Sequence, residues 1–346
     1  MVQLYKMESP SAYQFSIILP VRNGGEYLKT CIQSILGQTL AHFNLHILDS
    51  GSTDGTREWL ATLTDPRIKI YLSEEPLTIT QNWDRIKNIP RNGWMSIIGH
   101  DDILHTDYLE KMTRLIDEHP GASLYQTHFN LIDADGKLMR PCKSMLQKET
   151  AKGLLDKILN NTINIYGTGF MMRTADYDRV GGIPMFPNLL SADYVLWLKL
   201  SSIAYLATSQ QICFSYRVNQ STTLTTKAQI YIASLKLFIE YLLHAKDELA
   251  PAEDQHVYVK RIFSFYSRRV SRRLITESLE KRDNLRVSEF LKTTVIYAKQ
   301  FLQNGDSFNP AAISDVWIAK MIDTNPVSRR FFQFLKRIHP NPFLQS

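Results

Sequence analysis

Two adjacent carboxylates, Asp101 and Asp102, directly follow a short apolar stretch at residues 94–98. The stretch is rich in β-formers and comes after an Asn-Gly turn signal, so we expect a buried strand there. Parallel strands end at the ligand crevice of an α/β sheet, which places this pair where chemistry takes place. Hard oxygen ligands of this kind suit Mg²⁺ or Mn²⁺ held between the protein and substrate phosphates. The structural alternative is that Asp102 or Thr106 caps the helix that follows.

A third carboxylate, Asp49, ends another predicted strand and opens a loop at residues 49–56. The loop is rich in small and helix-capping residues and leads into a helix. A carboxylate at this position can accept a hydrogen bond from a base N–H, while small residues let a ligand approach the backbone. The alternative is a capped loop with Asp49 as a turn residue. The chain has no GxGxxG or Walker A sequence, which argues against the common dinucleotide and NTPase sites.

Strands and helices are predicted to alternate around these carboxylates. We expect strands at residues 15–21, 43–48, 67–72, 94–98, 123–130 and 167–172. We expect helices at residues 28–36, 57–63, 79–89, 108–118, 150–159 and 191–201. This alternation predicts a doubly wound α/β sheet, whereas from Thr226 to Leu302 the pattern is only helical.

Three cysteines, Cys31, Cys142 and Cys213, lie far apart along the 346 residues and form no CxxC pair. Their spacing excludes a cysteine-based zinc site and a disulfide scaffold, and it fits a reducing compartment. The sequence contains no signal-peptide pattern and no apolar run of about 18–20 residues, the length of a spanning helix. We therefore expect the protein in the cytoplasm or on the cytoplasmic face of a membrane.

Charge is unevenly distributed along the chain, whose formal net charge is +6. From His256 onward there are 16 Lys and Arg against 7 Asp and Glu, whereas the preceding residues hold 24 against 27. This asymmetry suggests nucleic acid or an anionic membrane surface as a partner. Because no DNA- or RNA-binding motif is present, we do not expect nucleic acid as a partner.

The segment 327–338 has the pattern of an amphipathic helix. Its apolar residues share one face of a helical wheel: Val327, Phe331, Phe334, Leu335 and Ile338. Its basic residues lie away from that face: Arg329, Arg330, Lys336 and Arg337. This pattern predicts a helix lying in the plane of a membrane surface, giving peripheral contact. The alternative is a helix docked by its apolar face on its own domain, with the basic face in solvent.

Five stretches, in their order and spacing, resemble family 2 glycosyltransferases of the GT-A fold. They are residues 18–23 with Tyr27-Leu28, residues 33–39, residues 49–56, the pair Asp101-Asp102, and residues 191–198. The resemblance implies a mixed, Rossmann-like α/β sheet in a glycosyltransferase domain at residues 14–224. A helical, basic C-terminal region follows at residues 225–346.

The resemblance also implies roles for individual residues. Asp193 would be the general base that takes the proton of the acceptor hydroxyl. Asp101 would hold Mg²⁺ or Mn²⁺ as the metal carboxylate of the D-x-D motif. The residues implied in binding the nucleotide donor are Pro20, Arg22, Asn23, Asp49, Ser52, Asp54 and Asp102, with Asp49 reading the base edge.

Three positions depart from the family pattern. Gly99 stands where the motif has its first carboxylate, Ala192 stands where an acidic residue usually precedes the base, and Asn219 stands where a His is common. His100 is a candidate compensating ligand, although a His beside a carboxylate pair is more often a hydrogen-bonding neighbour. Asp49, Asp101 and Asp193 are all retained, which favours an active enzyme.

These observations predict an inverting glycosyltransferase of the bacterial surface-polysaccharide type. It would move a sugar from a nucleoside-diphosphate donor, most simply a UDP-sugar, to a glycan or lipid-linked saccharide. The alternative is a catalytically inactive module of the same fold that binds nucleotide-sugars or glycans.

Overall fold

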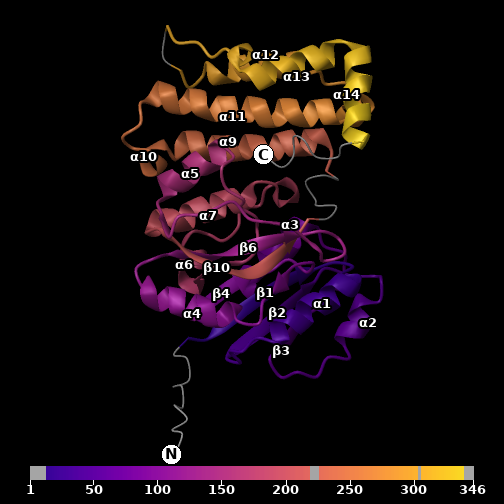
Figure 1. Ribbon diagram of the computed structural model, residues 1–346, viewed down its shortest axis with the longest axis vertical. Helices are drawn as coiled ribbons and strands as arrows, with labels where there is room; N and C mark the ends of the chain where they lie inside the picture. The colour runs from indigo at the N-terminus through magenta and orange to yellow at the C-terminus, as the bar shows by residue number, and fades with distance from the viewer. Residues whose placement is uncertain (1–12, 219–225, 303–304, 339–346) are drawn as a thin grey trace, which may run out of the picture. The chain divides into compact units, whose positions relative to one another are not determined.

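A computed structural model describes residues 13–218, 226–302 and 305–338, with side chains as far as residue 334 (Figure 1). These residues form two compact units. Unit 1 comprises residues 13–149, 166–182 and 203–218, and unit 2 comprises residues 150–165, 183–202 and the described residues from 226 onward. The predicted boundary at residue 224 lies outside the described residues and stays a prediction.

Unit 1 is built on a mixed sheet with the strand order β3-β2-β1-β4-β9-β6-β10-β5, to which β7 and β8 add at β6 and β10. Its strands are β1 Phe15–Val21, β2 Phe43–Asp49, β3 Ile68–Tyr71, β4 Trp94–Ile97, β5 Ile103–Leu104, β6 Leu124–Ile132, β7 Leu138–Pro141, β8 Lys148–Glu149, β9 Phe170–Arg173 and β10 Leu206–Arg217. Strands β1 to β4 run parallel, and β9 pairs antiparallel with both β4 and β6. The predicted α/β class with a mixed sheet is confirmed.

The helices of unit 1 follow the apolar pattern of the sequence. They are α1 Gly25–Leu36, α2 Thr56–Leu60, α3 Ile79–Asp84 with the 3₁₀ turn η1 Arg85–Asn88, α4 Tyr108–Glu118 and α6 Thr174–Arg179. Helix α1 buries Leu28, Cys31, Ile32 and Ile35, the face predicted from their spacing. Thr78 caps α3 in a reciprocal pair with Gln81, which satisfies backbone donors at the helix start.

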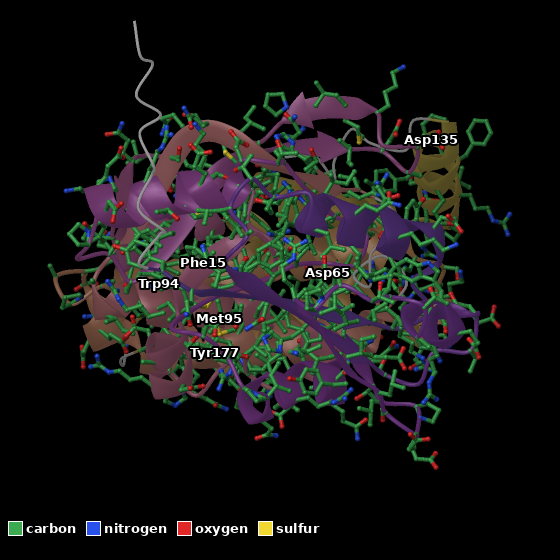
Figure 2. The ribbon with its side chains drawn as sticks, turned by 90° about the horizontal axis from the view of Figure 1, so that it is seen from below. Phe15, Asp65, Trp94, Met95, Asp135 and Tyr177 are labelled. Atoms are coloured by element: carbon green, nitrogen blue, oxygen red, sulfur yellow. The ribbon has the colours of Figure 1, made fainter. Side chains whose placement is uncertain are left out.

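An aromatic and sulfur-rich part of the core fixes the amino ends of the central strands. Phe15 of β1 pairs in register with Trp94 of β4, next to Met95. Figure 2 shows these three side chains near Tyr177 of α6, and the guanidinium of Arg91 links them because it lies over the Tyr177 ring and reaches the sulfur of Met95. This packing anchors β4 at the end opposite to the one from which Asp101 and Asp102 emerge.

Unit 2 is helical throughout its described part (Figure 1). Its helices are α5 Ala151–Leu159, η2 Pro187–Leu189, α7 Ala192–Ile203 (whose last residue belongs to unit 1), α9 Ala228–His244, α10 Lys246–Leu249, α11 Gln255–Thr276, η3 Glu280–Arg282, α12 Val287–Ala298, η4 Pro310–Ala312, α13 Ser314–Thr324 and α14 Pro326–Ile338. The predicted helical C-terminal region is confirmed. Within the described parts of the chain, none of the helices is both long and apolar enough to cross a bilayer.

A buried ionic cluster joins the last helices of unit 2. The Asp323 carboxylate of α13 accepts hydrogen bonds from Arg282 and from the backbone N–H of Val287, and it pairs with Arg329 of α14 at 3.3 Å. Arg282 is fully buried, and Asp323 and Arg329 nearly so. Because a buried charge is costly unless it is paired, this cluster fixes how α14 packs against α13.

Two elements near the site differ from the sequence analysis. Strand β10 is twelve residues long and lies inside the sheet, but the sequence analysis predicts no strand there. Its polar middle, with a register shift between Ser209 and Ile212, hides the apolar pattern. Helix α4 starts after Asp107, so neither Asp102 nor Thr106 caps it.

Candidate active site

The Asp49 loop is held together by hydrogen bonds from its own backbone. Asp49 ends β2 with a fully buried side chain, and its Oδ2 accepts from the N–H groups of Gly51 at 3.0 Å and Ser52 at 3.2 Å. The Arg57 guanidinium approaches the same oxygen at 3.9 Å. The carboxylate is thus fixed by a tight loop. This geometry also fits the alternative drawn from the sequence, in which Asp49 is a turn residue.

Two other predicted donor-site residues tie this loop to the turn after β1. The backbone N–H of Asn23 donates to Ser52 Oγ at 2.8 Å, and Asn23 Oδ1 accepts from the N–H of Thr53 at 2.8 Å. Asn23 adopts a positive φ of 54°, a conformation that asparagine tolerates better than most residues. Together the two turns form one rigid rim at the carboxyl ends of β1 and β2.

Asp54 completes this rim. Its carboxylate accepts from the N–H groups of Thr56 at 3.1 Å and Gly25 at 3.2 Å. Desolvation raises the pKa of Asp54, but the hydrogen bonds outweigh it, so the pKa lies below its usual value. Asp54 therefore joins the starts of α1 and α2.

The remaining two predicted residues of this region lie on β1 and just after it. Pro20 is buried within β1, opposite Leu48 of β2. Arg22 is exposed, and its Nη1 lies 3.5 Å from the carbonyl oxygen of Leu77. Only Arg22 of these two offers an exposed polar group to a ligand.

The acidic pair occupies two different environments. Asp101 is partly exposed, whereas Asp102 is buried and its Oδ1 accepts from the N–H of Arg217 at 3.0 Å. Burial, reinforced by the charge of Asp101, raises the pKa of Asp102 to about 8. Among the described residues, none donates a hydrogen bond of good geometry to its buried Oδ2, although the nearby Thr168 hydroxyl lowers the pKa of Asp102 somewhat.

Both carboxylates converge on Gly99. A Cβ atom at this residue would lie 2.9 Å from Asp102 Oδ2 and 3.0 Å from Asp101 Oδ1. The space that a side chain would occupy is therefore taken by carboxylate oxygens. A side chain at position 99 would therefore require the two carboxylates to shift.

Arg217, at the end of β10, holds the acidic loop from behind. Its Nε donates to the carbonyl of Asp101 at 2.8 Å, and its Nη1 donates to the carbonyls of Asp133 and Ala134, both at 2.9 Å. The guanidinium also lies over the Tyr27 ring, 4.6 Å from its centroid. The sequence contains the Tyr216-Arg217 pair, but nothing in its local pattern predicts this bracing role, because the partners are up to 190 positions away.

The residues around Gly99 could bind a divalent cation that takes its remaining ligands from a substrate. No group of three or more His, Cys, Asp or Glu side chains capable of holding a metal occurs in the described parts of the chain. Mg²⁺, however, is commonly held by one or two carboxylates together with substrate phosphates. The convergent oxygens of Asp101 and Asp102, one of them buried without a hydrogen bond, provide such a pair. His100 is partly exposed beside them.

Asp193 lies in unit 2, in the first turn of α7. The residue keeps some exposed surface, yet it is closely surrounded by protein, and this desolvation raises the pKa of Asp193 to about 7. Hydrogen bonds from the backbone at the helix start and the charge of Arg269 act in the opposite direction. Ala192, before it, is fully buried, so an acidic residue there would be desolvated. Asn219 lies outside the described residues.

Comparison with known proteins identifies the family of the domain that carries these residues. Residues 16–181 match the sequence model of the family described as "Glycosyl transferase family 2". The chain carries a family 2 glycosyltransferase domain. The matched segment contains the Asp49 loop and the acidic pair, and Asp193 lies beyond it.

Several named glycosyltransferases are similar to the chain. Bacillus subtilis TuaG, named for teichuronic acid biosynthesis, is 28% identical over 60% of this chain and 80% of its own length. Escherichia coli WfgD, named a UDP-Glc:alpha-D-GlcNAc-diphosphoundecaprenol beta-1,3-glucosyltransferase, is 25% identical over 62% of this chain and 81% of its own. The chain spans less than half the length of several other curated relatives, including 41% of Streptococcus pneumoniae GlyG.

The solved structure of S. aureus TarS 1-349 in complex with UDP has a similar fold. The TM-score is 0.63 with 13% sequence identity, and the match covers 95% of this chain and 93% of TarS 1-349. The GT-A fold predicted from the sequence, with its helical C-terminal region, is therefore confirmed.

Proposed function

We propose that this protein is an inverting glycosyltransferase that transfers a sugar from a nucleoside-diphosphate donor to a glycan or lipid-linked saccharide in surface polysaccharide synthesis. The observation that carries the proposal is the pair of acidic oxygens converging at the end of β4 within a family 2 domain. The names of TuaG and WfgD support the acceptor class. The fully retained set Asp49, Asp101 and Asp193 makes an inactive binding module the less favoured reading.

The spacing of the strands supports a nucleoside-diphosphate donor. Strands β2 and β4 flank β1 in parallel, so Asp49 and the acidic pair leave the same edge of the sheet. Two strand spacings separate β2 from β4, about 10 Å. This distance suits a base at Asp49 and a diphosphate at Asp101. The UDP complex of TarS and the UDP-Glc named for WfgD favour uracil as the base.

A divalent cation is part of this proposal. Asp101 and Asp102 would hold Mg²⁺ or Mn²⁺ together with the donor diphosphate. When bound, the cation would neutralise negative charge on the leaving nucleoside diphosphate. Arg217 keeps the loop that carries both carboxylates in place through its bond to the Asp101 carbonyl.

The reaction itself is a single displacement at the anomeric carbon. The acceptor hydroxyl oxygen forms the new glycosidic bond while the bond to the diphosphate oxygen breaks, which inverts the configuration. Asp193 takes the hydroxyl proton, and a carboxylate with a pKa of about 7 is well matched to this role near neutral pH.

The proposal is tested by measuring sugar transfer from a panel of nucleotide-sugars to an undecaprenol-diphosphate-linked saccharide. A parallel thermal-shift panel with and without Mn²⁺ identifies the donor, because a ligand that binds the folded state raises the melting temperature. We expect one UDP-sugar to stabilise the protein and to be consumed. Stabilisation without transfer, for any acceptor of this class, would support the inactive module instead.

We also propose that α14 brings the enzyme to the cytoplasmic face of a membrane. Val327, Phe331 and Phe334 are 74%, 61% and 56% exposed, while the basic residue Arg329 is turned inward to Asp323. These three apolar side chains of α14 therefore remain available to a membrane surface, which supports the proposal over the alternative of a docked helix. Neighbouring α13 adds the exposed Trp317, Ile318 and Met321.

Anionic vesicles test this second proposal. Each basic residue near an anionic surface contributes about 1 kcal/mol of attraction, and the exposed rings add apolar burial. We expect the double substitution Phe331→Ser and Phe334→Ser to abolish cosedimentation with anionic vesicles at low salt. Ile296→Ser is the matched control, since this side chain is 64% exposed on α12. Failure of the unmodified protein to bind would remove the membrane role.

A further inference from the structure

Three helices of unit 2 meet at Tyr194, the residue that follows Asp193 in the chain. Asp193 and Tyr194 lie in the first turn of α7, and Arg269 of α11 donates from Nη2 to the Tyr194 hydroxyl at 3.4 Å. The Tyr194 ring packs edge-on against Phe238 of α9, with centroids 5.4 Å apart. This packing fixes the phenol, and the phenol in turn limits where the guanidinium can lie.

Arg269 differs from the other arginines of its helix segment. The others pair with carboxylates: Arg268 and Arg272 with Asp315, and Arg273 with Glu277. Among the residues that the structure describes, Arg269 has no carboxylate within ion-pair distance. Its positive charge is therefore not neutralised by a pair and acts on the nearby Asp193.

We propose that Arg269 is a positioning residue for Asp193: its guanidinium, held by Tyr194 in the same helical turn as Asp193, places a positive charge that favours the carboxylate form of this base. This inference rests on the proposed role of Asp193 as the base. It adds a residue from the helical region, far outside the segment that matches the family model.

The charges that face Asp193 support this role. Desolvation raises the pKa of Asp193 to about 7, and Arg269 of α11 lowers it. The other titratable groups where these helices meet are phenols: Tyr194 of α7, whose pKa is raised mainly by burial, and Tyr231 of α9, over whose ring Arg273 lies. Phenols are neutral near pH 7, so Arg269 supplies the charge that favours the ionised carboxylate.

Without the guanidinium, the pKa of Asp193 rises, so more of the base is protonated at neutral pH. The acidic limb of the pH profile of kcat must then move to higher pH. An opposite charge within about 4–6 Å lowers a carboxyl pKa by about 1–3 units. Because Arg269 and Asp193 form no ion pair among the described residues, we expect a smaller shift, of about half to one pH unit.

The experiment compares pH profiles of kcat for the full chain and four variants. Arg269→Met removes the charge, and Arg269→Lys restores a cation and should largely restore the unmodified profile. Tyr194→Phe loosens the guanidinium and should shift the limb in the same direction but less, which keeps the test open if Arg269→Met does not fold. Arg268→Met, on the exposed side of the same helix, should leave the profile unchanged.

Other outcomes would overturn the inference. An unchanged acidic limb with a higher KM for the acceptor would mean that Arg269 binds substrate. Loss of kcat without any shift of the limb would mean a structural role. Turnover by Asp193→Asn would instead remove the base assignment itself, so failure of the proposed mechanism is distinguishable from failure of the Arg269 role.

Discussion

Asp102 in unit 1 and Asp193 in unit 2 are both carboxyl groups whose pKa is raised by burial, to about 8 and about 7. Their neighbours, however, carry opposite charges. Asp101 adds negative charge beside Asp102, whereas Arg269 adds positive charge near Asp193. The same desolvation therefore produces two different chemical sites.

This difference indicates what each site requires. Two crowded carboxylates gain most from a cation, because a metal ion removes both the mutual repulsion and the cost of burial. A single carboxylate near an arginine can remain ionised near neutral pH and still accept a proton, which suits a base. Substitutions of Asp193, of the acidic pair and of Gly99 test this contrast.

The largest effect is expected for Asp193→Asn. The amide cannot take a proton, so we expect kcat to fall by about 100- to 10,000-fold while donor binding is kept. Rates of sugar transfer and calorimetric binding of the donor measure the two properties separately. Asp247→Asn is the control, since this acid also begins a helix of unit 2 and its side chain is fully exposed. Near-normal turnover would show that Asp193 is not the base.

A smaller effect is expected for the acidic pair. Asp101→Ala should weaken Mn²⁺-dependent nucleotide binding by about 10- to 100-fold, and more than Asp102→Ala does. The reason is that Asp101 is the more exposed carboxylate, whereas Asp102 is also engaged with the backbone of Arg217. Titration calorimetry with and without Mn²⁺ measures this, with Asp135→Ala as an exposed control in the same unit. Full activity in excess EDTA would exclude a required metal.

The smallest change, a single methyl group at Gly99, tests the crowding directly. Gly99→Ala should reduce the free energy of unfolding by about 1–3 kcal/mol, because the new Cβ meets both carboxylates. Gly93→Ala is the matched control, since a Cβ there meets nothing within 4 Å. Denaturant unfolding of both variants gives the difference. Equal stability of the two would mean that the acidic loop relaxes freely and that the carboxylates are not held in place.

Local sequence patterns were enough to predict the strands that carry the acidic residues and the helices between them. β1 is predicted to the residue, and β2 and β4 agree within one residue, because their apolar runs and turn signals are local. The same local information predicts the helix at Tyr108–Glu118 and the amphipathic pattern of α14. The predicted roles of Asp49, Asp101 and Asp193 remain predictions, since they come from the resemblance.

The way these residues are held depends on contacts that form only when the chain folds. β10 was missed because its order comes from pairing with β6 across the sheet, while its own polar middle carries no strand signal. The bracing by Arg217 and the hydrogen bond from Arg269 to Tyr194 join residues distant in the chain. The filled space at Gly99 depends on how the folded acidic loop turns its two carboxylates. Likewise, the sequence showed that α14 has two faces, but only the burial of Arg329 against Asp323 decided which face points to solvent.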